Sequence, residues 1–189
     1  MKKDIILCGV GGQGILSIAT VIGEAATAAG LNLKQAEVHG MSQRGGDVQS
    51  NLRLSTEPIW SDLIPCGQAD LIISMEPMEA LRYTDYLNEG SAVITSSAPF
   101  VNIPNYPEKE ALLAEVATLP GVKMADIETL AREKGMPRGA NMILLGMAAK
   151  DLEILSPDQL KAAIARVFAA KGEAVVNSNI EAFETGLGL

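Results

Sequence analysis

The chain has 189 residues, of which 48% are hydrophobic, and it carries a formal net charge of −8. This length and apolar content suit one sizeable core, so we expect a single domain over residues 1–189. The acidic balance and the absence of a basic run argue against nucleic acid and anionic membranes as partners. Two cysteines, Cys8 and Cys66, are too few for a zinc site or an iron–sulfur cluster held by this chain alone.

Residues 4–8, Asp-Ile-Ile-Leu-Cys, form an apolar run that predicts a first strand. The run is far shorter than the roughly 20 residues that span a membrane, so we expect a cytoplasmic protein. A glycine-rich turn follows, and apolar residues then repeat at helical spacing until Gly30. Glycines let backbone N–H groups approach a ligand, and the following helix offers the positive end of its dipole. The sequence therefore predicts an anion-binding turn, made of Gly9, Gly11, Gly12, Gln13 and Gly14.

The same glycines fit a second interpretation. Gly9, Gly11 and Gly14 have the spacing of a dinucleotide-binding fingerprint, and an acidic residue, Glu37, follows at about the 20-residue distance that suits a ribose contact. Glu37 is equally compatible with a solvent-facing carboxylate at the end of a strand. A stand-alone NAD(P)-binding reductase therefore stays open as the alternative function.

A long polar loop over residues 39–47 follows the second predicted strand, and such loops tend to carry function. Arg44 stands beside Gly45 and Gly46, so its guanidinium and the neighbouring backbone can clamp a phosphate or carboxylate. Arg44 capping a turn through backbone carbonyls is the alternative. His39, the sole histidine, is expected to be hydrogen-bonded in the loop rather than to act as a general base.

Strands and helices alternate along the middle of the chain. Strands are predicted over residues 33–38, 48–55, 70–75, 92–95 and 122–125, and helices over residues 77–87, 107–119 and 127–134. The second of these strands alternates in polarity, which favours an antiparallel or edge strand, whereas the third is continuously apolar, which is typical of a central parallel strand. Glu76 and the pair Ser96-Ser97 each follow a strand, so we expect them at the sheet edge that holds the glycine turn.

The final third of the chain is predicted to be helical. Ser156-Pro157-Asp158-Gln159 has the pattern of a capping box. Residues 141–149 are apolar all round, so their helix is expected to be buried, and in a domain this small full burial could require a partner chain. Asn141 is expected to cap this helix rather than to join Arg138 in binding an anion.

These elements predict an α/β fold: a three-layer α/β/α Rossmann-like sandwich with a mostly parallel, mixed sheet and a helical C-terminal third. The edge where ligands bind carries no catalytic constellation. The sequence has no G-x-S-x-G elbow, no paired cysteines and no Gly-Asp-Gly opening of a thiamine diphosphate site. We therefore predict no catalytic residue and no metal ligand in this chain.

Three segments together resemble the gamma-type subunit or domain of the 2-oxoacid:ferredoxin oxidoreductases. They are residues 9–14, the segment Ser42–Gly46 after the second strand, and the segment Asn141–Gly146 at the start of the late helix. The resemblance spans nearly the whole chain. Within the family, residues 39–46 are most similar to the beta subunits of indolepyruvate ferredoxin oxidoreductases.

The resemblance implies a division of labour between subunits. A larger partner would carry thiamine diphosphate and 4Fe-4S clusters, decarboxylate an aryl-2-oxoacid such as indolepyruvate, and pass electrons to ferredoxin as the aryl-acetyl group is transferred to coenzyme A. This subunit would complete the active site and contribute to the site for coenzyme A. The residues concerned are Gly9, Gly11, Gly12, Gln13, Gly14, Arg44, Gly45 and Gly46.

Overall fold

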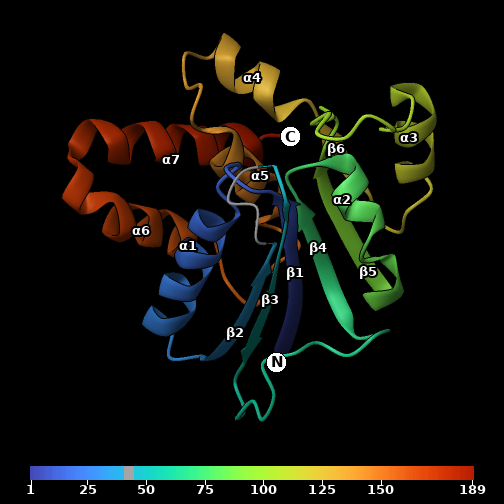
Figure 1. The fold of residues 1–189 in the computed structure, drawn as a ribbon. Helices are drawn as coiled ribbons and strands as arrows, with labels where there is room; N and C mark the ends of the chain where they lie inside the picture. Colours follow the sequence, from blue (N-terminus) through green and yellow to red (C-terminus); the bar gives the residue numbers. More distant parts are fainter. Residues whose placement is uncertain (41–44) are drawn as a thin grey trace.

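The computed structural model describes residues 1–40 and 45–189, which form a layered α/β structure around one sheet (Figure 1). The sheet has six strands in the order β2-β3-β1-β4-β5-β6. Strands β1, β4, β5 and β6 pair in parallel, whereas β3 is antiparallel to both of its neighbours, β1 and β2. The predicted mostly parallel, mixed sheet is therefore confirmed. The bounds are β1 Lys2–Val10, β2 Asn32–His39, β3 Asp47–Ser55, β4 Ala69–Ser74, β5 Leu87–Ser96 and β6 Lys123–Ala125.

Strand β3 is antiparallel, as its alternating polarity predicts, but it lies inside the sheet, and β2 forms that edge. The apolar side chains of β3, Leu52 and Leu54, are fully buried in the main core. The polar side chains on the opposite face are covered as well, because Asn51 and Arg53 bond to the segment that follows the strand. A half-polar strand can therefore occupy the interior of a sheet when its polar face has partners.

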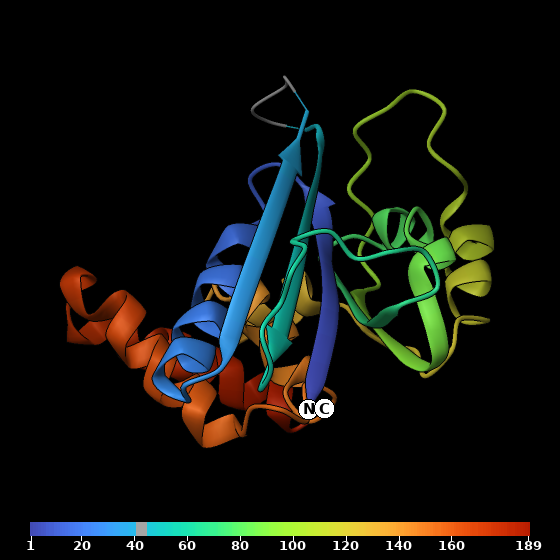
Figure 2. The ribbon, with the colours of Figure 1, turned by 90° about the horizontal axis from the view of Figure 1, so that it is seen from below.

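Helices cover both faces of the sheet, which confirms the three-layer arrangement (Figures 1 and 2). The main core lies on one face, under α1 Ile15–Ala28, α4 Ile127–Glu133, α5 Ala140–Ala148, α6 Pro157–Phe168 and α7 Glu173–Leu187. A smaller core lies on the other face, which carries α2 Pro77–Leu81, α3 Lys109–Val116 and a 3₁₀ turn over Thr84–Tyr86. Helix α2 is shorter than the predicted span because the 3₁₀ turn and β5 follow it closely. Within the described ranges, no helix combines the length and the apolar character that crossing a membrane requires.

The apolar helix α5 is buried by the same chain, so the partner chain that its full burial could have required is not needed. Helix α7 crosses it closely at two glycines. A Cβ added at Gly146 of α5 would meet the carbonyl oxygen of Phe183, and one at Gly186 of α7 would meet that of Ile143. The two glycines therefore let the backbones of α5 and α7 come into contact, and α7 buries the face of α5 that would otherwise be exposed.

Candidate functional site

The glycine turn between β1 and α1 is held in shape by Gln13. The side-chain Oε1 of Gln13 accepts a hydrogen bond from the backbone N–H of Val10 at 2.7 Å, and its Nε2 donates to the carbonyl oxygen of Met75 at 3.3 Å, just beyond β4. A Cβ at Gly9 would lie 2.9 Å from this Oε1 and 3.0 Å from the Cβ of Met75. Gly9 and Gln13 therefore build the turn, and their part in ligand binding stays a prediction.

Gly12 and Gly14 are required by their backbone conformations, with φ angles of +104° and +86°. Gly14 is the N-cap of α1, and no side chain of residues 1–40 or 45–189 caps this helix end. The unpaired N–H groups of the first turn of α1 are therefore available to an anion.

Asn141 joins the starts of α1 and α5. Its Nδ2 donates to the carbonyl oxygen of Gly14 at 3.2 Å, and its Oδ1 accepts from the N–H of Met142 at 3.0 Å. The N-cap of α5 is Gly139, so the prediction that Asn141 caps the helix is wrong. The side chain is engaged by the glycine turn, which is remote in sequence and which local spacing does not reveal.

The glycine turn and the β2–β3 connection lie side by side, as the shared-edge prediction requires. The N–H of Gly11 donates to the carbonyl oxygen of Gly46 at 2.8 Å, and the N–H of Gly45 donates to that of Gly11 at 3.5 Å. A third loop joins them, because Asn102 Nδ2 donates to the carbonyl oxygen of Gly45 at 2.7 Å. Arg44 lies outside the described residues, so its role as an anion clamp stays a prediction.

A cleft of about 560 Å³ opens beside the glycine turn, at the carboxyl ends of β1, β4 and β5. Arg138 lines the cleft, is exposed, and has no hydrogen-bond or ion-pair partner within residues 1–40 and 45–189. A guanidinium without an internal partner is free to bind an anionic group. The lining residues that matter here are Gly12, Gly14, Phe100, Glu128, Arg138 and Asn141.

Glu128, in the first turn of α4, was missed by the sequence analysis. Its Oε2 accepts a hydrogen bond from Ser96 Oγ at 2.7 Å, and burial raises the pKa of its carboxyl group. Ser96 was expected at this edge of the sheet. Glu128 could have been predicted there too, because it follows β6, and β6 ends beside β5. The carboxyl group gives the cleft an oxygen that can accept a hydrogen bond from a ligand, whereas the guanidinium of Arg138 can only donate.

Glu76 fixes the wall of the cleft. Its fully buried carboxylate caps α2 through the N–H of Glu79 at 2.9 Å, and it also accepts hydrogen bonds from the N–H of Phe100 at 3.2 Å and from the Tyr106 hydroxyl. Burial and the hydrogen bond to Glu76 raise the pKa of Tyr106, so its hydroxyl keeps its proton at neutral pH. Glu76 lies at the edge that the sequence predicts, where it holds the loop that carries Phe100.

The dinucleotide interpretation of Glu37 finds no support in the sheet. Glu37 is exposed on β2, and β3 separates β2 from the strand that carries the glycine turn. Two strand spacings place β2 roughly 10 Å from β1, whereas a dinucleotide fold sets the ribose-binding acid on the strand next to the turn. The backbone of His39 pairs with Val48 at the end of β2, and its side chain lies outside the described part of the chain.

The two cysteines are in different environments. Cys8 is buried in β1, where desolvation raises the pKa of its thiol, and Cys66 is exposed. A thiol with a raised pKa is a poor nucleophile and a poor metal ligand. Among the described residues, no group of three or more His, Cys, Asp or Glu side chains is arranged to hold a metal ion.

Comparison with known proteins places this architecture in a family. A family model described as pyruvate ferredoxin/flavodoxin oxidoreductase matches residues 4–189. The indolepyruvate oxidoreductase subunit IorB of Thermococcus kodakarensis is 37% identical over 99% of this chain and 96% of its own length. The subunit of the same name in Methanothermobacter thermautotrophicus is 33% identical over 100% of this chain and 97% of its own length.

A solved structure has the same fold. It is the 2-oxoglutarate:ferredoxin oxidoreductase from Magnetococcus marinus with 2-oxoglutarate, coenzyme A and succinyl-CoA bound, which superposes with a TM-score of 0.77 at 24% sequence identity. The match covers 99% of this chain and 30% of that one, so the fold corresponds to one part of a longer polypeptide. Taken with the near-complete family match and the two full-length relatives, these findings show that the chain belongs to the pyruvate ferredoxin/flavodoxin oxidoreductase family.

Proposed function

We propose that this chain is a subunit of a heteromeric 2-oxoacid:ferredoxin oxidoreductase that acts on indolepyruvate or a similar aryl-2-oxoacid. The observation that carries the proposal is the pairing of Gly11 with Gly45 and Gly46 beside the cleft, in a chain whose full-length relatives are named as indolepyruvate oxidoreductase subunits. The reaction is the coenzyme A-dependent oxidative decarboxylation of the 2-oxoacid.

The cleft receives the anionic part of coenzyme A. Its volume of about 560 Å³ lies within the range of small-molecule sites. The amino end of α1, which no described side chain caps, and the backbone of Gly12 and Gly14 suit a phosphate group. The guanidinium of Arg138, which has no partner among the described residues, supplies a positive charge. Glu128 is placed to accept a hydrogen bond from a donor on the same ligand. Arg44, Gly45 and Gly46 complete the anion-binding rim in this proposal.

The reactive groups come from a partner subunit. One 4Fe-4S cluster needs about four cysteine ligands, and this chain has 2 cysteines, one of them buried with a raised pKa. We assign thiamine diphosphate and the clusters to a larger subunit, which also reduces ferredoxin. Held there, thiamine diphosphate would supply the electron sink that decarboxylation of a 2-oxoacid needs. This chain binds and orients coenzyme A and helps to close the active site, and no residue of it acts as a catalytic acid, base or nucleophile.

Residues 1–189 act as one domain in this proposal, and the cytoplasm stays our prediction for where the enzyme works. Reconstitution tests the proposal. This chain and the larger subunit should each be inactive alone, and mixing them should restore reduction of ferredoxin or a dye that depends on both indolepyruvate and coenzyme A. Full activity of either polypeptide alone would contradict the proposal. A fluorescence titration with NADH tests the alternative, because saturable micromolar binding would favour a stand-alone reductase.

A further inference from the structure

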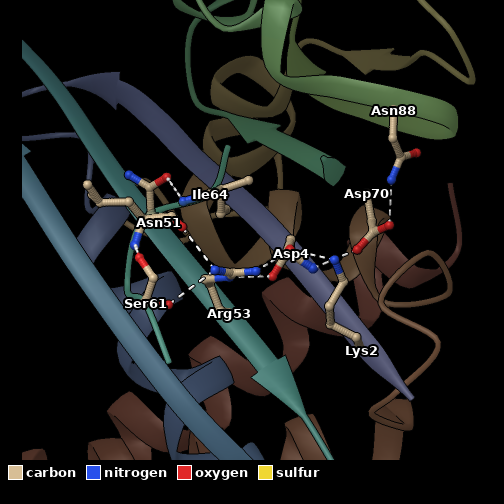
Figure 3. Close-up of polar contacts among 9 residues, drawn as sticks. Lys2, Asp4, Asn51, Arg53, Ser61, Ile64, Asp70 and Asn88 are labelled. Carbon is tan, nitrogen blue, oxygen red and sulfur yellow. Dashed lines mark hydrogen bonds and ion pairs between the residues drawn. The ribbon is translucent and has the colours of Figure 1, made fainter. Parts of the chain in front are cut away.

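Residues 56–66, here called the strap, follow β3 and bond to side chains on the sheet face opposite the main core. Figure 3 shows these contacts at Ser61 and Ile64. Arg53 Nη1 donates to the carbonyl oxygens of Ser61 at 3.1 Å and Leu63 at 2.9 Å. Asn51 Oδ1 accepts from the N–H of Ile64 at 3.3 Å, and the Ile64 side chain is buried in the smaller core. Side chains of β3 therefore fix the strap at Ser61, Leu63 and Ile64.

The guanidinium that holds the strap is itself fixed. Its Nε lies 2.8 Å from Asp4 Oδ1 and its Nη2 lies 3.0 Å from Asp4 Oδ2, a two-pronged contact with a fully buried carboxylate. Lys2 Nζ lies 2.8 Å from the same carboxylate (Figure 3). Because two-pronged pairs of this kind restrict both side chains, Arg53 holds the strap in place at Ser61 and Leu63 before anything binds to it.

This rigid strap presents large apolar side chains to solvent. Trp60 is 91% exposed and Leu63 is 57% exposed, although the strap is anchored on both sides of them. A hollow of about 260 Å³ lies beside Trp60, lined in part by Pro58 and Ile59. Exposed tryptophans on rigid supports are favourable centres of protein interfaces, because an indole buries a large area with few rotatable bonds.

The charges around Trp60 indicate the kind of partner. The cationic groups beside Trp60, Lys2 and Arg53, are both paired with Asp4. Glu57 and Asp62 of the strap are exposed, and neither carboxylate forms an ion pair within the described chain. A second copy of this chain would bring the same acidic strap against itself, and both copies carry a net charge of −8. A different polypeptide with basic side chains around an apolar pocket fits this surface.

We propose that the strap docks another subunit of the oxidoreductase, which receives Trp60 in an apolar pocket rimmed by Lys or Arg side chains. This inference rests on the proposed function, in which the chain works as part of a heteromeric enzyme. The strap is separate from the cleft. Asp4 lies near the start of β1 and Gly11 directly follows its end, and the rise of about 3.3 Å per residue puts them roughly 20 Å apart. The strap therefore attaches the subunit without covering the anion-binding rim.

The test uses this chain, labelled with 5-fluorotryptophan, together with the larger subunit in its natural form. Trp60 is the only tryptophan, so the labelled chain has one ¹⁹F resonance. We expect this resonance to shift and broaden when the complex forms. Trp60→Ala should raise the dissociation constant of the subunits about 30-fold, the effect expected of an interface hot spot, and Trp60→Phe should restore part of the affinity. The isolated variants should melt as the unsubstituted chain does.

Two further variants make the test specific. Val38→Ala removes two methyl groups from a residue that is 56% exposed at the end of β2 remote from the strap, and it should leave the affinity unchanged. Glu57→Lys combined with Asp62→Lys should weaken association about tenfold at low salt, and less as salt is added. An unchanged or improved affinity would overturn the predicted basic rim.

The outcomes separate the two proposals. If an active complex forms while the ¹⁹F resonance stays unchanged and Trp60→Ala binds normally, the docking proposal is overturned and the proposed function stands. If no complex forms with the larger subunit, both proposals are overturned. Self-association of the isolated chain that Trp60→Ala abolishes would identify a second copy as the occupant and overturn the commitment to another subunit.

Discussion

The backbone N–H of Gly11 donates to the carbonyl oxygen of Gly46 at 2.8 Å, which joins the turn after β1 to the connection between β2 and β3. In the sheet, β3 lies between β2 and β1, so the chain leaves β2 and comes back beside β1. This return brings Gly45 and Gly46 next to the glycine turn that follows β1. The rim of the cleft is thus built by backbone hydrogen bonds before any ligand is present. A rim that is already ordered in this way loses little entropy when a ligand binds.

Gly14→Ala should destabilise the protein more than Gly12→Ala. Both residues have positive φ angles, which cost an alanine about 1–2 kcal/mol. An added Cβ at Gly14 would also lie 2.6 Å from Asn141 Nδ2, whereas no atom of the described residues lies within 4 Å of one at Gly12. Chemical denaturation measures the free energy of unfolding of both variants. Equal losses would show that the Asn141 side chain moves aside without an energetic cost.

Gly146→Ala should prevent folding or lower the free energy of unfolding by more than about 4 kcal/mol, because the new methyl group would overlap the backbone of α7. Gly188→Ala is the matched control, since its nearest contact would be 3.5 Å away. Soluble yield and thermal melting report the outcome. A well-folded Gly146→Ala variant would mean that α5 and α7 can move apart.

Arg138→Ala should raise the apparent KM for coenzyme A in the reconstituted enzyme about tenfold, the loss expected for one charge-assisted contact. The affinity between subunits should stay the same. Arg166→Ala is the control, because Arg166 lies on α6 and pairs with Glu24 away from the cleft. An unchanged KM would exclude Arg138 from the anion site.

Glu128 should make stability depend on pH. Burial holds the pKa of its carboxyl group above the usual 4.5, so the folded state binds its proton more tightly than the unfolded state does. The stability gained from this proton is complete below pH 4.5 and is lost as the pH rises through the raised pKa.

Glu128→Gln should therefore remove that loss. In urea unfolding between about pH 4 and pH 8, the free energy of unfolding of the variant should rise relative to that of the unsubstituted protein as the pH increases. Glu133→Gln, at an exposed position of the same helix, should leave the pH profile unchanged. A parallel profile for Glu128→Gln would contradict the assignment of this pH dependence to Glu128.

The sequence by itself determined the features whose hydrogen bonds are local. Ser156 and Gln159 form the predicted capping box, with each side chain bonded to the other's backbone N–H over three residues. Likewise, the continuously apolar segment of residues 70–75 forms the central parallel strand β4. Such patterns can be recognised in the sequence because residues close in the chain form the hydrogen bonds, or because one periodicity describes the whole element.

Only the tertiary structure decided the features that depend on remote partners. Asn141 bonds to Gly14 across 127 positions, and Glu128 accepts from Ser96 across 32. The burial of α5 follows from the crossing of Gly146 and Gly186, and the place of β3 follows from the cover that its polar face receives. Side-chain type and spacing do not predict which remote segment will contact a given residue, because the packing of the whole chain determines those contacts.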